Sequence, residues 1–113
     1  MAVSDIYEVI QTPQAEEHIR QIVHYVAVNL KNPDAAYGFL DKIDLLDEYL
    51  MKSPQKCGFI DVYPWNSFIH KTVIEGTSYI AYFWIDEDSL KVYIVGYSYV
   101  GQDQEKFLSS LDI

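Results

Sequence analysis

Two adjacent residues in the second half of the chain, His70 and Lys71, have the side chains best suited to acid–base chemistry on a charged substrate. The imidazole could donate a proton and the ammonium could contact a phosphate. The turn at Glu75-Gly76 decides which of them points to the face of Tyr82 and Tyr93: a two-residue turn puts Lys71 on that face, and a three-residue turn puts His70 there. The alternative for this pair is a solvated position on a strand.

Tyrosines recur at alternate positions near the end of the chain, where they could stack nucleobases or grip a protein partner. A hairpin with Ile85 opposite Leu90 would divide the side chains of the last two strands between the two faces of the sheet. The face suited to packing on helices carries Tyr79, Ala81, Phe83, Leu90, Val92 and Ile94. The opposite face carries Ile80, Tyr82, Trp84, Tyr93, Val95, Tyr97 and Tyr99. We predict target binding by Tyr82, Trp84, Tyr93 and Tyr97, the alternative being a satellite core under the C-terminal segment.

The other polar residues do not predict a metal site. His18 and His24 lie six residues apart on a predicted helix, so they do not share a face. A set of carboxylates at helical spacing could suit a hard cation, but a solvated acidic face explains it better. That set is Asp41, Asp44, Asp47 and Glu48. We expect no metal and no cofactor.

Length and charge limit the kinds of partner. The chain has 113 residues, which suits one domain spanning 1–113, and a net charge of −9. Nucleic-acid binders replace counterions around phosphates with Lys and Arg, so this charge opposes binding to duplex DNA and favours neutral or basic partners. Cys57 is the only cysteine and the first residues lack a signal-peptide pattern, so we expect a cytoplasmic protein. The longest apolar run, Tyr79 to Ile85, is too short for a membrane span.

The first half of the chain predicts a strand followed by two helices. Ile6 to Ile10 is rich in β-branched and aromatic residues. Thr12-Pro13 and Asn32-Pro33 each pair an N-cap residue with a proline suited to the first helical turn. Leu30-Lys31-Asn32 ends the first helix and Lys52-Ser53-Pro54 ends the second. The link between them is so short that the helices must fold back as an antiparallel hairpin.

Four β-rich runs follow, at Phe59 to Tyr63, Phe68 to Ile74, Ser78 to Ile85 and Leu90 to Tyr99. Their connections are too short for crossover helices, which predicts an antiparallel meander. We place the N-terminal strand at an edge of this sheet or beside its central strand, and a short helix over Gln104 to Leu111 above the aromatic face. The expected fold class is α+β, with the helical hairpin packed on the sheet.

Short motifs occur in a fixed order along most of the chain. They are Tyr7-Glu8-Val9, Thr12-Pro13-x-Ala15, Tyr25, Asn32-Pro33-x-Ala35-Ala36, Ser53-Pro54, Tyr79-Ile80-Ala81-Tyr82, Val92 to Val95 and Val100-Gly101-Gln102-Asp103. This ordered set resembles the RelE/ParE family of bacterial type II toxin–antitoxin toxins. The resemblance implies a compact toxin of a plasmid-stabilisation (addiction) module, neutralised by a cognate antitoxin. Its target would be DNA gyrase or ribosome-bound messenger RNA. Separately from the resemblance, a homodimer is a candidate assembly.

The chain departs from that family at its basic positions. The central strand of the family typically reads Tyr-Arg-(Ile/Leu)-x-Tyr, and the arginine position falls at Ile80 here. RNA cleavage by the RelE branch uses cationic stabilisation of a phosphate, whereas the ParE branch does not need hydrolytic residues. We therefore predict a toxin-like component that binds a protein target such as DNA gyrase. The alternatives are a ribosome-dependent mRNA endoribonuclease with the catalytic set His70, Lys71 and Tyr99, and a disarmed member that serves only as a binding module.

Overall fold

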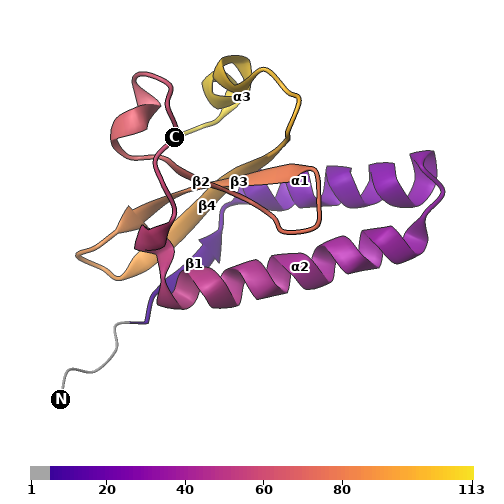
Figure 1. Cartoon of the computed structure of the whole chain (residues 1–113), viewed down its shortest axis with the longest axis horizontal. Helices are drawn as coiled ribbons and strands as arrows, with labels where there is room; N and C mark the ends of the chain where they lie inside the picture. Colours follow the sequence, from indigo (N-terminus) through magenta and orange to yellow (C-terminus); the bar gives the residue numbers. More distant parts are fainter. Residues whose placement is uncertain (1–5) are drawn as a thin grey trace.

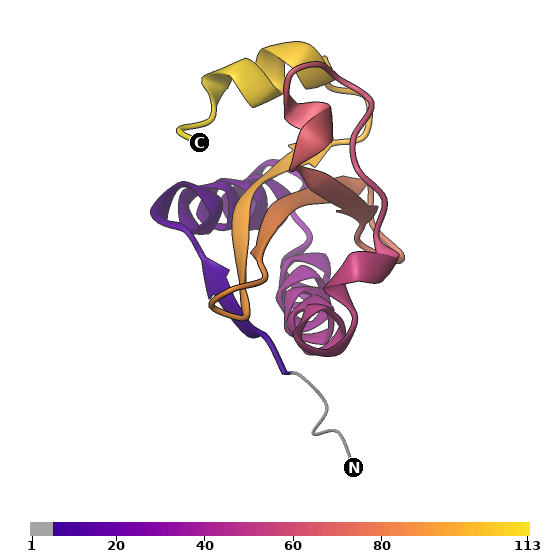
Figure 2. The ribbon, with the colours of Figure 1, turned by 90° about the vertical axis from the view of Figure 1, so that its left-hand side faces the viewer.

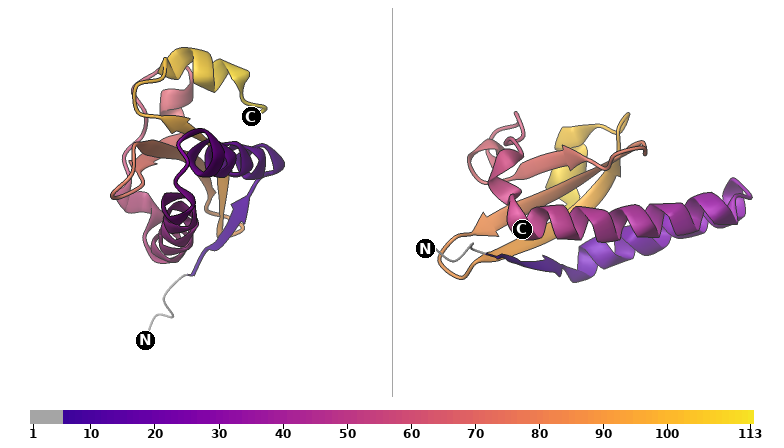
Figure 3. Two further views of the ribbon diagram at one scale, coloured as in Figure 1. Left: turned by 90° about the vertical axis from the view of Figure 1, so that its right-hand side faces the viewer. Right: turned by 60° about the horizontal axis from the view of Figure 1, so that its bottom comes forward.

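The computed structural model describes residues 6–113, which form a helical hairpin, a four-stranded sheet and a short closing helix (Figure 1). Helices α1 (Pro13–His24) and α2 (Pro33–Lys52) lie on one side of the sheet, and α3 (Gln104–Ser110) lies on the other (Figure 2). The hairpin projects beyond the sheet at the end where the two helices are joined (Figure 3). The predicted α+β class is confirmed.

Both long helices begin at the N-caps that the sequence predicts. The Oγ1 of Thr12 accepts a hydrogen bond from the Ala15 N–H at 3.3 Å, and the Oδ1 of Asn32 accepts one from the Ala35 N–H at 3.1 Å. Each cap satisfies an N–H group that has no partner within its helix. The first helix continues past α1 as a π-helical turn, Tyr25–Asn29, before the chain reverses.

The sheet contains β1 (Glu8–Gln11), β2 (His70–Val73), β3 (Tyr79–Asp86) and β4 (Lys91–Tyr99), in the order β1-β4-β3-β2. The last three strands form the predicted antiparallel meander. β1 lies at an edge and pairs with β4 in parallel. The sheet is therefore mixed, with its parallel pair formed by the two strands that are farthest apart along the chain.

Two predicted details of the strands are wrong. The segment Phe59 to Tyr63 is not a strand: it contributes one isolated bridge, between Phe59 and His70. In the β3–β4 hairpin Ile85 pairs with Val92 rather than Leu90, because the turn extends to Leu90, which takes a left-handed φ of 52°. A shift of two residues preserves the face of each side chain, so this part of the predicted sorting survives.

A bulge in β4 reverses the sorting farther along the strand. Phe83 pairs with Ile94 but Tyr82 pairs with Gly96, so Val95 is an extra residue on β4. Side chains beyond a one-residue bulge point to the opposite face. Tyr97 consequently joins the side of the sheet that faces the helices. The prediction that Tyr97 and Tyr99 share a face with Tyr82 and Tyr93 is wrong.

Apolar side chains fill both sides of the sheet. The helix-side core contains the buried residues Tyr7, Ala15, Ile22, Phe39, Ile43, Leu46, Leu50, Ile74, Ala81, Phe83, Val92, Ile94 and Tyr97. The reverse core lies between the sheet, α3 and the loop before β2, and contains Ile60, Ile69, Ile80, Tyr82, Val95, Phe107, Leu108 and Leu111. The predicted C-terminal helix thus covers much of the face that had been expected to bind a target.

Candidate functional site

His70 is held inside the protein. It is buried, and its ring stacks between Phe59 and Phe83, with centroid distances of 4.1 and 5.2 Å. The Nδ1 atom lies 2.7 Å from the carbonyl oxygen of Cys57, which can only accept, so Nδ1 carries the proton. This packing and tautomer give the imidazole a structural role in joining β2 to the loop before it.

Lys71 and Tyr99 lie apart from His70 and from each other. Lys71 pairs with Tyr82, so its exposed side chain points to the face opposite that of His70. The turn is longer than either predicted length, because the Ile74 N–H bonds to the Tyr79 carbonyl oxygen and residues 75–78 lie between them. Tyr99 pairs with Tyr79, four positions along β3 from the partner of His70, which is roughly 13 Å. The three residues of the predicted catalytic set do not form one site.

Two of the four residues predicted to bind a target are buried in opposite cores. Tyr82 lies in the reverse core, where its hydroxyl is 2.8 Å from the Ser98 Oγ and accepts a hydrogen bond from the Gln104 Nε2 at 3.1 Å. Tyr97 lies in the helix-side core, and its hydroxyl donates to the Gln11 Oε1 at 2.8 Å. Burial raises the pKa of Tyr97 strongly, so its phenol stays protonated.

Trp84 and Tyr93 are the other two residues of that set, and they remain partly accessible. Their rings stack across the β3–β4 ladder, with centroids 4.7 Å apart and planes 17° from parallel. Trp84 packs at the margin of the reverse core. A stacked, half-buried pair of this kind offers a small aromatic platform on the reverse face.

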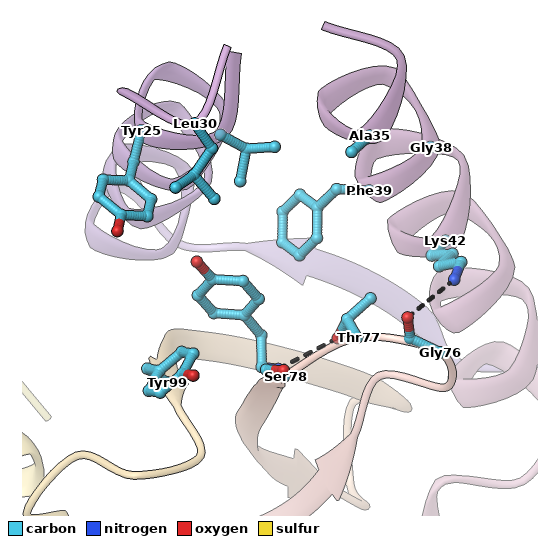
Figure 4. A pocket seen from close by; sticks show the side chains of 12 residues that line it. Tyr25, Leu30, Ala35, Gly38, Phe39, Lys42, Gly76, Thr77, Ser78 and Tyr99 are labelled. Atoms are coloured by element: carbon cyan, nitrogen blue, oxygen red, sulfur yellow. Dashed lines mark hydrogen bonds between the residues drawn. The ribbon is translucent and has the colours of Figure 1, made fainter. Parts of the chain in front are cut away.

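A larger concave surface lies on the other side of the sheet, between the joined end of the helical hairpin and the β2–β3 turn (Figure 4). It has a volume of about 700 Å³. We call it the phenol groove, because Tyr25, Tyr79 and Tyr99 line it together with Phe39 and Lys42. Tyr79 contacts Phe39 and Tyr99 edge to face, with centroid distances of 5.4 and 5.7 Å.

The polar groups of the phenol groove are suited to binding rather than to proton abstraction. Burial raises the pKa of Tyr79, and the nearby Tyr25 and Tyr99 phenols raise it further, so the Tyr79 hydroxyl stays neutral and can donate. The Lys42 Nζ donates to the carbonyl oxygen of Gly76 at 3.2 Å and ties the β2–β3 turn to α2. The groove therefore combines aromatic walls with neutral hydroxyls, which is a composition typical of partner-binding surfaces.

The acidic residues of α2 do not converge on a cation site. Asp41, Asp44 and Glu48 are exposed, while Asp47 is half-buried and accepts a hydrogen bond from the Gln11 Nε2 at 3.2 Å. Burial raises the pKa of Asp47 and the Gln11 hydrogen bond lowers it in part. Within residues 6–113, no group of three or more His, Cys, Asp and Glu side chains could hold a metal ion. Over the same residues no helix is both long and apolar enough to cross a membrane.

Solved structures resemble this fold although the sequence itself has no match among protein-family models or curated proteins. One is the chromosomal ParDE toxin–antitoxin system of Pseudomonas aeruginosa, with a TM-score of 0.67 and 18% identity over 86% of this chain and 99% of that chain. The chain has a RelE/ParE-like toxin fold. A second is the RelBE2 toxin–antitoxin complex of Mycobacterium tuberculosis, with a TM-score of 0.61 and 13% identity over 88% of this chain and 97% of that chain.

This RelE/ParE-like fold brings Tyr99, a member of the predicted catalytic set, together with three groove residues that the predicted site does not include. Tyr25 comes from the π-helical turn, Lys42 from α2 and Tyr79 from the start of β3. Tyr99 joins them only because the bulge turns it to the helix side. The available signal was Gly96, since an isolated glycine within a strand pattern indicates a bulge.

Proposed function

We propose that this chain is the toxin-like component of a type II toxin–antitoxin pair, acting in the cytoplasm by binding a protein target such as DNA gyrase. The observation that carries the proposal is the fold, which resembles a chain in each of two solved toxin–antitoxin structures over nearly the whole of the matched chains. A cognate antitoxin would neutralise the chain by covering its working surface. The phenol groove is the surface that we assign to this binding.

Binding is favoured over RNA hydrolysis by the positions of the polar side chains. The imidazole of His70 is packed between two rings, Lys71 points to the opposite face, and Tyr99 lies near the far end of β3. Cleavage of RNA needs an acid, a base and a cation within hydrogen-bonding reach of one phosphate. Exposed apolar side chains at the groove, by contrast, are what a protein partner can bury: Tyr25, Leu30 and Tyr99 are 48%, 56% and 54% exposed.

Growth arrest tests the proposal. Induced expression of the chain in a bacterial host should stop growth, and the purified protein should inhibit DNA supercoiling by gyrase. The double variant Tyr25→Ala/Tyr99→Ala should lose both effects, because it removes the aromatic walls of the groove. Tyr37→Ala is the matched control, since Tyr37 is 70% exposed on α2 and lies outside the groove.

The same strains separate the alternatives. Messenger cuts in a translating extract that are lost on His70→Ala and Tyr99→Phe would establish an endoribonuclease instead. Normal growth with full expression of folded protein would indicate a member of this fold that only binds. Supercoiling inhibition that survives the double variant would move the working surface away from the phenol groove.

A further inference from the structure

The outer edge of β2 already accepts a short segment of the chain's own backbone. The Lys71 N–H donates to the carbonyl oxygen of Gly58 at 3.1 Å, and the Ile60 N–H donates to the carbonyl oxygen of Ile69 at 2.9 Å. Phe59 faces His70 in an antiparallel bridge between these two bonds. The sheet therefore continues past β2 for about three residues and then stops.

Beyond that point the edge is open at Val73. The Ile74 N–H donates to the carbonyl oxygen of Tyr79, so Ile74 and Tyr79 form a hydrogen-bonded pair of the antiparallel ladder. Such pairs alternate with non-hydrogen-bonded pairs, so in the next pair, Val73 and Ile80, the backbone N–H and C=O groups point away from each other. The N–H and C=O of Val73 thus face outward as those of Lys71 do. Nothing in the part of the chain that the structure describes bonds to them, and the Val73 side chain is 56% exposed. An edge of this kind is a template for another strand.

A second groove lies directly beside this open edge, between β2 and α2. It has a volume of about 250 Å³, and we call it the edge groove. Its walls are Lys42, Leu45, Leu46, Tyr49, Thr72, Val73, Ile74 and Glu75. Leu45 is 63% exposed and Tyr49 is 45% exposed. Large apolar side chains next to unpaired backbone groups are the two features by which an extended peptide is recognised.

Carboxylates border the edge groove. Asp41 and Glu48 lie four residues before and three residues after Leu45, so they flank it on the surface of α2, and Glu75 lines the groove from the β2–β3 turn. Within residues 6–113 the one ion pair joins Arg20 and Glu17, which leaves these three carboxylates without a cation. One lysine, Lys42, lines the edge groove, and its Nζ donates to the Gly76 carbonyl oxygen at 3.2 Å. The whole chain carries −9, so the long-range field also favours a cationic occupant.

We propose that the edge groove receives an extended segment of the neutralising partner, and that this segment combines apolar anchors with Lys and Arg. The inference rests on the proposed function for the existence of such a partner. The segment pairs with the outer edge of β2 at Val73, places an apolar side chain over Leu45 and Tyr49, and sets its cations against Asp41, Glu48 and Glu75. A second copy of this chain is a poorer occupant, because it would bring another −9 surface to the same carboxylates.

Selection from a library of random 12-residue peptides, panned on the whole protein, tests the inference. We expect the enriched peptides to carry net positive charge with apolar residues between the cations. They should lose at least tenfold in affinity on the variant Asp41→Lys/Glu48→Lys/Glu75→Lys. The matched control is Glu16→Lys/Asp88→Lys/Glu105→Lys, which changes the net charge equally at exposed positions outside the edge groove and should lose far less.

Hydrogen exchange at the Val73 amide gives a second measurement, which electrostatic attraction without strand pairing would not change. The Val73 amide should exchange at least tenfold more slowly when an enriched peptide is bound, because its N–H becomes part of a ladder. Enrichment of acidic peptides, equal losses on the two triple variants, or an unprotected Val73 amide would each overturn the inference. So would Val73 protection in peptide-free protein together with a dimer in sedimentation, which would assign the groove to a second copy.

The two proposals fail separately. Peptide selection needs only the folded chain and is unaffected by whether the chain arrests growth. Arrest without enrichment of basic peptides would refute the edge-groove inference and leave the toxin-like function standing. Enrichment of basic peptides without arrest would refute the toxin-like function and leave an edge groove whose partner must be sought elsewhere.

Discussion

One ring nitrogen of His18 accepts a hydrogen bond from the backbone of β4. Its Nδ1 accepts a hydrogen bond from the Tyr97 N–H at 3.1 Å, just beyond the bulge in β4, while the ring packs against Phe107 with centroids 5.5 Å apart. Burial lowers the pKa of His18 and the Glu17 carboxylate raises it in part, so the neutral ring is the form that the fold favours. Protonation would remove the acceptor that the bulge depends on.

The unfolding free energy should consequently fall when the pH is lowered through the range where unfolded histidine titrates. The pKa of His18 is lower in the folded chain than its ordinary value of about 6.5, so the unfolded chain binds the proton first as the pH falls. Stability is then lost from about pH 6.5 down to the folded pKa. Urea unfolding at pH 7.5 and 5.0 measures this.

His18→Gln is the control for that experiment, because glutamine can accept the same hydrogen bond and does not titrate. At pH 7.5 we expect it to unfold within about 1 kcal/mol of the parent, and on acidification it should lose less stability than the parent does. The raised pKa of Asp47 acts in the opposite direction but is common to both proteins, so it cancels in the comparison. Equal losses in the two proteins would show that His18 does not carry the effect.

At the level of elements, a feature could be predicted from the sequence when the residues that determine it lie close together along the chain. The helix starts were predictable because Thr12 and Asn32 cap N–H groups three residues away. The bulge in β4 has a local signal only in Gly96, and the side chains that pack against Gly96, those of His18 and Leu111, come from α1 and from the C-terminal segment. That one extra residue explains why Tyr97 and Tyr99 were assigned to the wrong face, and with them the candidate binding surface.

Gly96 should tolerate no side chain while this packing persists. A Cβ there would lie 2.9 Å from the His18 Nδ1 and 3.0 Å from the Leu111 Cδ2, so Gly96→Ala should lower the unfolding free energy by about 1–3 kcal/mol. The penalty should shrink by at least about 0.5 kcal/mol in a His18→Ala background, as a double-mutant cycle would reveal. Gly38→Ala, where an added Cβ meets nothing within 4 Å on α2, should instead stabilise by up to about 1 kcal/mol.

On the scale of the whole molecule, the sheet is stabilised from both sides by cores of different origin. The helix-side core is formed by α1 and α2, and the reverse core by α3 and the loop before β2. Phe107 and Leu108 of α3 are buried in the reverse core, where the Phe107 ring lies 5.1 Å from the ring of Tyr82. The short C-terminal helix is thus part of the fold rather than an appendage.

Leu108→Ala should therefore lower the unfolding free energy by about 2–5 kcal/mol, because Leu108 is fully buried and the truncation leaves a cavity. Loss of this size is a large part of the roughly 5–15 kcal/mol typical of a domain. Ile113→Ala, at a position 46% exposed, should change stability by less than about 0.5 kcal/mol. A small effect of Leu108→Ala in urea unfolding would mean that the reverse core contributes little.

The parallel pairing of β1 with β4 also bears on biosynthesis. β1 precedes every other element of the fold in the sequence, yet its ladder partner β4 is the last strand, and the Tyr7 hydroxyl donates to the Glu87 carboxylate across 80 residues of sequence. Both halves of the helical hairpin are translated before that partner exists. A nascent chain consequently completes this sheet only after β4 has left the ribosome.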